Sequence, residues 1–167
     1  MTDLPIVPFE MTLHVRDACL CLHAQRAARA LARRFDEALR PAGLTNEQFS
    51  LLMALNRPRP ALLGDVAALL GADRTTLTAA LKPLVRRGLA EVAVDPNDRR
   101  GRRIALTDEG RARLAAALPF WTREHGALEA ELEGSDPARL RRDLAILSSP
   151  RPGAPAPALC DSQEMTS

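Results

Sequence analysis

Apolar positions recur at steps of three and four residues in several long stretches of this chain, which is the spacing of one face of an α-helix. The first stretch runs from Leu13 to Arg40, and its end is predicted by Pro41 and Gly43. The apolar positions of this stretch fall on one shared face, formed by Leu20, Ala24, Ala27, Leu31, Phe35 and Ala38.

Two shorter helices are expected next. The sequence Thr45-Asn46-Glu47-Gln48 is a capping box, in which the side chains of Thr45 and Gln48 can satisfy each other's backbone N–H groups. This helix is expected to end before Pro58. A further helix is predicted over about Leu63–Leu70, although no Ser, Thr or Asp precedes it as a cap.

The fourth expected helix opens at Asp73, whose carboxylate can cap the exposed N–H groups of the first turn. Gly88 predicts its end. Pro83 lies inside it and removes one backbone hydrogen bond, so we expect a kink or a shortened last turn. The predicted buried stripe consists of Leu77, Ala80, Leu81 and Leu84.

The helical spacing then gives way to two short runs, Leu89–Val94 and Arg103–Leu106, which predict a β-hairpin around a turn at Asp95–Arg103. Thr107 begins a long helix, and Asp136-Pro137 begins a last one. The long helix contains Pro119, which predicts a kink. Its apolar seam consists of Leu114, Leu118, Trp121, His125, Leu128 and Leu132.

This order of elements predicts a mainly α fold with a small β-hairpin wing (α+β), a winged helix-turn-helix with long N- and C-terminal dimerisation helices. We expect one regulator domain over residues 13–147, with a DNA-binding lobe at about 45–107 and dimerisation helices at about 13–40 and 107–147. A dimer is expected because a single small domain offers the long apolar faces too little cover. Residues 1–12 are expected to form a flexible arm, and residues 148–167 a disordered tail.

The positive charge of the chain is concentrated in the predicted lobe. Eight basic residues between Arg74 and Arg103 stand against three acids, which gives that stretch +5 in a chain whose total is +2. No apolar run is long enough for a membrane span, and no secretory signal is recognisable, so a cytoplasmic protein without membrane contact is expected. Enzyme motifs such as a Gly-rich phosphate loop or a nucleophile elbow are lacking, and neither enzymatic activity nor a cofactor is expected.

The polar face of the fourth helix has the chemistry that reads double-stranded DNA. Arginine can bind a guanine edge through two hydrogen bonds, and threonine methyl groups suit thymine methyls. The arginines at the hairpin tip repel one another unless an anion is present, and a narrow minor groove supplies one. Asp98 can hold one of these arginine side chains in position. The alternatives are a solvated helix start, a solvated basic loop, and a winged helix that binds another protein in place of DNA. The candidate DNA-binding residues are Arg74, Thr75, Thr76, Thr78, Lys82, Asp98, Arg99, Arg100 and Arg102.

Three motifs resemble the MarR family of winged helix-turn-helix regulators: Gly71-x-Asp73-Arg74-x-Thr76, Arg87-Gly88-Leu89 and Asp98-x-Arg100-x6-Thr107. The resemblance covers roughly Cys19 to Leu147. It implies a homodimer on a palindromic operator, with the first, fifth and sixth helices at the dimer interface. By the same resemblance Arg100 enters the minor groove, Asp98 orients it, and the fourth helix lies in the major groove. The missing cap before Leu63 and the proline at position 83 depart from the family pattern.

Members of this family commonly respond to small aromatic acids, so a repressor released by a small aromatic or anionic effector is expected. Phe49, Met53 and Trp121 are candidate pocket residues, although a place in the core is the favoured interpretation.

A thiol sensor is the alternative, with Cys19 as the reactive residue and Cys160 as its partner. His23 and Arg16 have the helical spacing to lie on the same face as Cys19, where a cation would favour the thiolate. The chain lacks the tyrosines of the family's peroxide sensors. A metal site is not expected, because Cys19 and Cys21 point about 200° apart on a helix.

Overall fold

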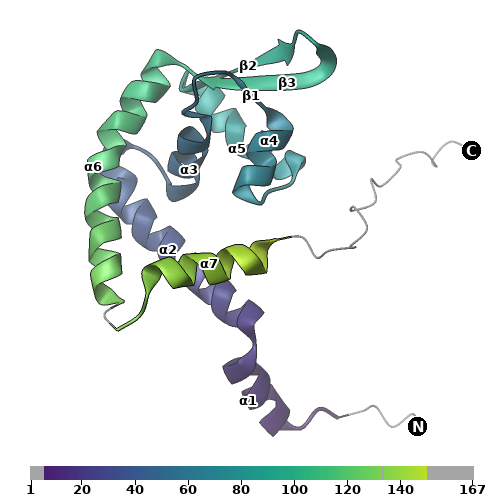
Figure 1. The fold of residues 1–167 in the computed structure, drawn as a ribbon, viewed down its shortest axis with the longest axis vertical. Helices are drawn as coiled ribbons and strands as arrows, with labels where there is room; N and C mark the ends of the chain where they lie inside the picture. The colour runs from purple at the N-terminus through teal and green to yellow at the C-terminus, as the bar shows by residue number, and fades with distance from the viewer. Residues whose placement is uncertain (1–5, 133, 150–167) are drawn as a thin grey trace, which may run out of the picture. The chain divides into compact units, whose positions relative to one another are not determined.

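The computed structural model describes residues 6–132 and 134–149. Two compact units divide the described chain, one reaching to Leu128 and the other starting at Glu129. None of the helices in these ranges is long and apolar enough to cross a membrane. The fold is mainly helical with a small sheet, as predicted, and the order of elements along the chain is drawn in Figure 1.

The N-terminal helical stretch is divided into two helices, α1 (Phe9–Ala18) and α2 (Leu20–Leu39). The prediction of one helix from Leu13 was wrong at its start, because Cys19 adopts an extended conformation with ψ of 104° and interrupts the helix there. A 3-10 turn, η1 (Arg40–Ala42), follows α2 and ends at Gly43, whose φ of 66° lies in the left-handed region.

The helices α3 (Asn46–Leu55) and α4 (Leu63–Leu70) lie where the sequence placed them. The capping box of α3 is formed, with Gln48 N–H donating to Thr45 Oγ1 over 3.2 Å and Thr45 N–H donating to Gln48 Oε1 over 3.3 Å. No side chain caps α4, as expected. Instead, Asp65 lies in its first turn, where a negative charge is favourable beside the helix dipole.

The helix α5 (Arg74–Arg86) continues for three residues beyond Pro83, so the proline does not end the helix. Its N-terminus is capped by Asp73, which accepts from Thr76 N–H over 2.8 Å. Its end is fixed by Gly88 with φ of 68°, as predicted. Three leucines attach the helix to the core, Leu77, Leu81 and Leu84, with relative exposures of 1%, 4% and 0%.

The sheet has three antiparallel strands in the order β1-β3-β2. The two-residue strand β1 (Ala61–Leu62) was not predicted; it pairs with Arg103 and Ile104 of β3. The strand β2 (Ala90–Asp95) has the expected length but begins one residue later than predicted. The strand β3 (Asp98–Leu106) is longer than expected, so only Pro96 and Asn97 separate the two strands. Figure 1 shows this hairpin projecting beyond α4 and α5.

The helix α6 (Asp108–Glu131) is joined to the root of the hairpin. Thr107 Oγ1 donates to the Gly88 carbonyl over 2.5 Å and accepts from Gly110 N–H over 3.0 Å. Gly110 is buried, and a Cβ atom there would lie 1.9 Å from the carbonyl oxygen of Leu89. The start of α6 therefore packs directly on the peptide that connects α5 with β2.

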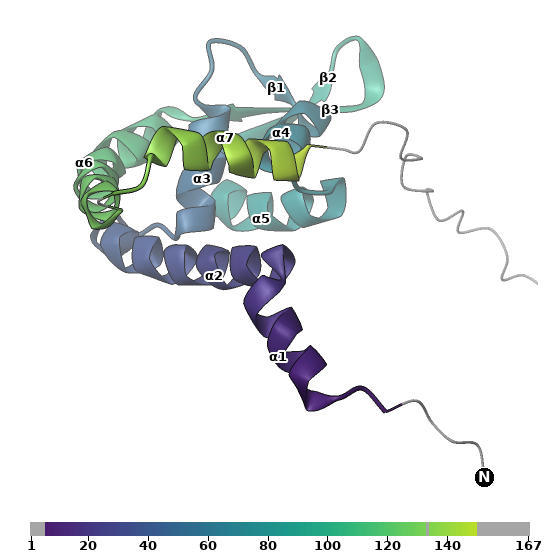
Figure 2. The same ribbon diagram turned by 60° about the horizontal axis from the view of Figure 1, so that its bottom comes forward.

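Further along α6, Glu124 receives a hydrogen bond from Arg34 of α2. Figures 1 and 2 both show α2 and α6 meeting beside the bundle of α3, α4 and α5. The second unit contains α7 (Pro137–Ser148), which begins at Asp136-Pro137 as predicted. Asp136 caps it by accepting from the N–H groups of Ala138 and Arg139. The predicted tail lies outside the described residues from position 150 onward.

Candidate nucleic-acid interface

The outer face of α5 carries the polar residues that the sequence assigned to DNA. All five side chains, Arg74, Thr75, Thr76, Thr78 and Lys82, belong to exposed residues, whereas the leucines between them face the core. The spacing of the buried leucines therefore fixes which side of the helix is free to enter a groove.

Two of the threonines on this face have their hydroxyl hydrogens engaged within the helix. Thr76 Oγ1 donates to Asp73 Oδ2 over 2.8 Å, and Thr78 Oγ1 donates to the Arg74 carbonyl over 2.7 Å. Each hydroxyl keeps its acceptor capacity, and each side chain keeps its methyl group. Towards a base edge these residues can therefore accept from an adenine or cytosine amino group or contact a thymine methyl.

Asp73 is an anchor for this end of α5. The N–H and hydroxyl groups of Thr76 both donate to its carboxylate, and these hydrogen bonds lower the pKa of Asp73 below its ordinary value. The charged form is favoured, so the cap is fully ionised at neutral pH.

Arg74 extends over the N-terminal turn of α4. Its Nη2 lies 3.3 Å from the position that a Cβ atom would have on Gly64, so any side chain at position 64 would press on the guanidinium. Arg74 borders a polar cavity of about 520 Å³ that continues to the wing. Three acids and two further arginines also line this cavity, namely Asp65, Asp95, Asp98, Arg100 and Arg102.

The tip of the wing is built around a slip in strand register. Val94 pairs with Arg102, whereas the next residue, Asp95, pairs with Asp98. The three residues Arg99, Arg100 and Gly101 therefore have no counterpart on β2 and form a bulge. Arg102 Nη1 donates to the carbonyls of Arg99 and Gly101, each over 3.0 Å, and these hydrogen bonds stabilise the bulge.

The role expected for Asp98 requires a correction. Its Oδ1 accepts from the backbone N–H of Arg100 over 2.9 Å, so it orients Arg100 through the main chain and not by pairing with a guanidinium. The ion pair in the wing is made by Asp95, whose Oδ1 lies 3.1 Å from Arg103 Nε. This difference arises because the two-residue turn places Asp95 inside the hairpin and Asp98 at its surface.

Asp95 is the residue of the wing that the sequence did not single out. It is 5% exposed, and its Oδ1 accepts from Asn97 N–H over 3.0 Å. This hydrogen bond, together with Arg103, lowers the pKa of Asp95 below its ordinary value. Gly101 is packed against it, because a Cβ atom at position 101 would lie 3.0 Å from Asp95 Cβ. An acid directly after Val94, the last exposed apolar position of the strand, was the available signal.

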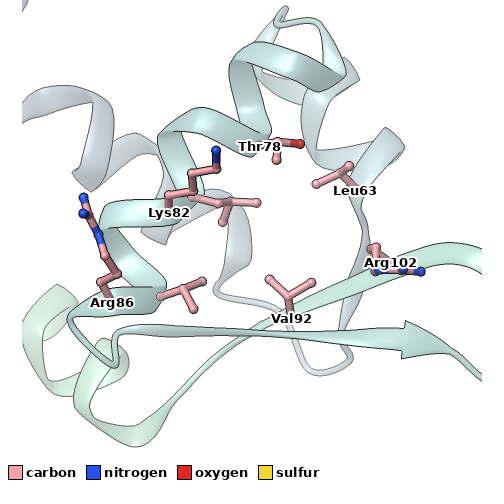
Figure 3. Close-up of a pocket in the computed structure, with 8 residues that line it drawn as sticks. Leu63, Thr78, Lys82, Arg86, Val92 and Arg102 are labelled. Carbon is pink, nitrogen blue, oxygen red and sulfur yellow. The ribbon is translucent and has the colours of Figure 1, made fainter.

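A second surface that the sequence missed lies between α5 and the wing. A hollow of about 520 Å³ opens there, and Figure 3 shows Lys82, Arg86 and Arg102 around its edge and Val92 at its wall. Arg86 was not among the candidate DNA-binding residues. Its spacing from Lys82 is four residues, which places both cations on one face of α5.

The three candidate pocket residues differ in their surroundings. Phe49 is 4% exposed and stacks on Trp121 with ring centroids 6.1 Å apart, whereas Met53 is 44% exposed. Trp121 also contacts the ring of His125 at 4.6 Å. Phe49 thus occupies the core, as the favoured interpretation held, and an effector pocket at these residues stays a prediction.

The arrangement expected for a reactive Cys19 is not found. The break in the helix places Cys19 at the N-cap of α2, where its Sγ accepts from Leu22 N–H over 3.4 Å. His23 Nδ1 lies 2.9 Å from the carbonyl oxygen of Cys19, so the imidazole contacts the backbone of Cys19 and not its thiol. Arg16 is held by Asp17 through two hydrogen bonds of 2.6 and 2.8 Å. The proposed partner Cys160 lies outside the described residues.

Comparison with known proteins adds a family match to this geometry. A model of the MarR family matches residues 42–101, which include α3, α4, α5, β1, β2 and the first residues of β3. A curated relative, the transcriptional activatory protein BadR of Rhodopseudomonas palustris, is 35% identical over 89 residues. That alignment covers 52% of this chain and 51% of BadR, so the chain spans about half the length of this relative.

Solved structures extend the likeness to most of the chain. The transcriptional regulator MosR of M. tuberculosis, solved in complex with DNA, is 42% identical, with 78% of this chain and 93% of that chain covered and a TM-score of 0.67. The transcriptional repressor CouR on a 23-mer DNA duplex is 32% identical, with coverages of 80% and 93% and a TM-score of 0.64. CouR from Rhodococcus jostii RHA1, solved with p-coumaroyl-CoA, is 26% identical, with coverages of 80% and 94% and a TM-score of 0.66.

Proposed function

The chain belongs to the MarR family of DNA-binding transcriptional regulators, and we propose that it is a homodimeric repressor that binds a palindromic operator and is released by a small anionic or aromatic effector. The observation that carries this proposal is the shared exposure of the polar face of α5 and the wing arginines in one lobe. Its relatives named above are regulators and not enzymes.

Within this proposal the two DNA-reading elements divide the work. The candidate residues of α5 lie in the major groove, where Arg74 and the threonine methyl groups contact base edges. The bulge at Arg99–Gly101 brings Arg100 into the adjacent minor groove, and Asp98 fixes its main chain. Arg102 supports the bulge and adds positive charge at its base.

Exposed apolar residues support a dimer. Leu20 of α2 is 70% exposed and Leu118 of α6 is 44% exposed. In the second unit, Leu140 and Leu144 of α7 are 44% and 48% exposed. Large exposed apolar side chains at helical spacing are typical of surfaces that a partner covers. We therefore assign the dimer interface to about 13–40 and 107–147, and the DNA-binding lobe to about 45–107.

Repression and effector release rest on the relatives. A CouR described as a transcriptional repressor was solved on a DNA duplex, and CouR from Rhodococcus jostii RHA1 was solved with p-coumaroyl-CoA. BadR is described as activatory, which makes the sign of regulation a point for experiment. A reporter placed under the selected operator decides it, because deletion of a repressor raises expression whereas deletion of an activator lowers it.

Operator selection from a random duplex library tests the proposal as a whole. We expect a palindrome whose half-sites are about 10 base pairs apart, since two recognition helices on a two-fold axis reach successive turns of one groove. The affinity should also fall steeply between about 50 and 200 mM salt. Recovery of single half-sites would contradict the dimer, and a flat salt dependence would contradict DNA binding altogether.

A further inference from the structure

The hollow between α5 and the wing, here called the helix–wing hollow, has a distinct composition. From α5 it is lined by Thr78, Leu81, Lys82, Val85 and Arg86, which follow one another at steps of three and one and therefore share one helix face. The opposite wall is formed by Val92 of β2 and Arg102 of β3, and Leu63 of α4 completes it (Figure 3).

The charge around this hollow is entirely positive. Among the described residues that line it, three are cationic and none is acidic. Lys82, Arg86 and Arg102 belong to exposed residues, and Figure 3 shows all three at the border of the hollow. Arg102 Nη1 donates to two backbone carbonyls, so no carboxylate neutralises its guanidinium in these contacts. Three cations with no acid among the lining residues of the hollow attract an anion to it.

The floor of the hollow is apolar. Leu81 is buried, whereas Val85 and Val92 are 40% and 44% exposed and face the open space with Leu63. An apolar wall reduces the screening of the cations by water, which strengthens their interaction with a bound anion. A matching occupant therefore carries a negative charge together with apolar surface. A phosphodiester with its deoxyribose has both properties.

We propose that the helix–wing hollow seats the sugar–phosphate strand that separates the major from the minor groove. This inference rests on the proposed function. A helix in the major groove and a wing in the adjacent minor groove straddle one backbone strand, and the hollow lies between those two elements. Lys82, Arg86 and Arg102 bind the phosphate oxygens, and Val85 and Val92 contact the deoxyribose carbons. Arg86 is thereby assigned as a DNA-contacting residue.

The dependence of operator affinity on salt tests the role of Arg86. Each phosphate contact adds about 0.9 to the slope of log affinity against log salt. Arg86→Gln should lower the steepness of this slope by about 0.9 and weaken operator and random duplex by the same factor. Arg86→Lys should keep the slope. This variant conserves the charge and is therefore the matched control.

A second pair of variants tests the wall. Val92→Asp places a negative charge in the hollow and should weaken operator binding on the order of tenfold or more, because like charges are brought together. Ala93→Asp adds the same charge to the other face of the same strand and should weaken binding far less. Thermal melting of both variants shows whether either one is unfolded.

These measurements separate the two levels of the proposal. One outcome is that the unchanged protein shows a steep salt dependence while Arg86→Gln has the same slope. This result would overturn the proposal that the helix–wing hollow binds the sugar–phosphate strand, and it would leave DNA binding by the protein intact. Equal losses in Val92→Asp and Ala93→Asp would overturn it as well. If Arg86→Gln keeps the slope but loses protection by benzoate against thermal unfolding, the hollow binds a free amphipathic anion and not the DNA strand.

Discussion

The helix α5 and the wing both expose arginine side chains, but different forces hold them in place. The helix is attached by three leucines that are almost completely buried, and it has a cap at each end. In the wing, by contrast, Val92 and Val94 are 44% and 53% exposed. The wing depends on strand pairing, on the bulge at Arg99–Gly101 and on one buried acid, Asp95.

This difference indicates which substitutions and pH changes should affect each element. Burial of leucine side chains couples the position of α5 to the stability of the whole lobe, because the same residues form its core. The shape of the wing tip depends on polar contacts within about ten residues of chain. A change of charge or pH should therefore alter the wing while α5 stays in place, and a cavity in the core should affect both.

The largest effect is expected from Leu84→Ala. Leu84 is completely buried, and truncation of such a leucine costs about 2–5 kcal/mol of unfolding free energy through lost contacts and a cavity. Chemical denaturation followed by circular dichroism measures this loss. The control is Val85→Ala at the neighbouring, 40% exposed position. Equal losses in the two variants would mean that α5 is not held by the core.

Arg100→Ala should act on binding and not on folding. Its side chain is exposed, and its removal should cost on the order of 1–3 kcal/mol of operator binding, concentrated at the base pairs that face the wing. Fluorescence anisotropy on the selected operator and on variants at those positions measures this. Thermal melting should show an unchanged Tm, because the Arg100 side chain is exposed. Unchanged affinity would show that the wing does not reach the duplex.

Asp95→Asn should reveal the pH dependence of the wing. The pKa of Asp95 is lowered by Asn97 N–H and by Arg103, so its stabilising effect is complete above the ordinary carboxyl pKa. That effect is lost as the pH falls through the lower pKa of the folded state. At pH 7 the substitution should lower Tm by about a few degrees. Near pH 3 the difference from the unchanged protein should shrink.

The matched control for this experiment is Asp98→Asn, an exposed acid at the other side of the same turn that can still accept from Arg100 N–H. It should leave Tm at pH 7 nearly unchanged. A Tm difference between the unchanged protein and Asp95→Asn that does not depend on pH would mean that the ion pair with Arg103 adds no stability.

The smallest effect is expected from Val94→Ala. Val94 is 53% exposed at the edge of the bulge, and substitutions of this kind usually change stability by about 0.5 kcal/mol or less. Denaturation under the conditions used for Leu84→Ala gives the direct comparison. A loss comparable with that of Leu84→Ala would show that the wing has a core of its own, and the contrast with α5 would fail.

The sequence predicted the elements whose signals are local. The capping box at Thr45, the cap at Asp73 and the terminating Gly88 each act within a few residues, and all three are present. The strand β1 was missed because two residues carry no periodicity and owe their conformation to pairing with β3. The break at Cys19 has no Pro or Gly to announce it.

The candidate DNA-binding residues could be named from the sequence, but their contacts could not. The partner of Asp98 depended on the register of the hairpin, which a slip of strand pairing sets and which composition does not encode. Arg86 escaped attention because the hollow beside it is created by two elements that meet only in the folded chain. Asp95 was hidden for the same reason, since its burial follows from the tight turn.

Because Gly110 has no side chain, the start of α6 lies in direct contact with the backbone of Leu89. The helix α5 and the wing share that root, because α5 ends at Arg86 and β2 begins at Ala90. In a dimer, a shift of α6 would therefore move α5 and the wing together as one rigid body. Such a shift would change the position of the two DNA-binding lobes relative to each other. The contacts of each lobe with its own half-site would stay the same.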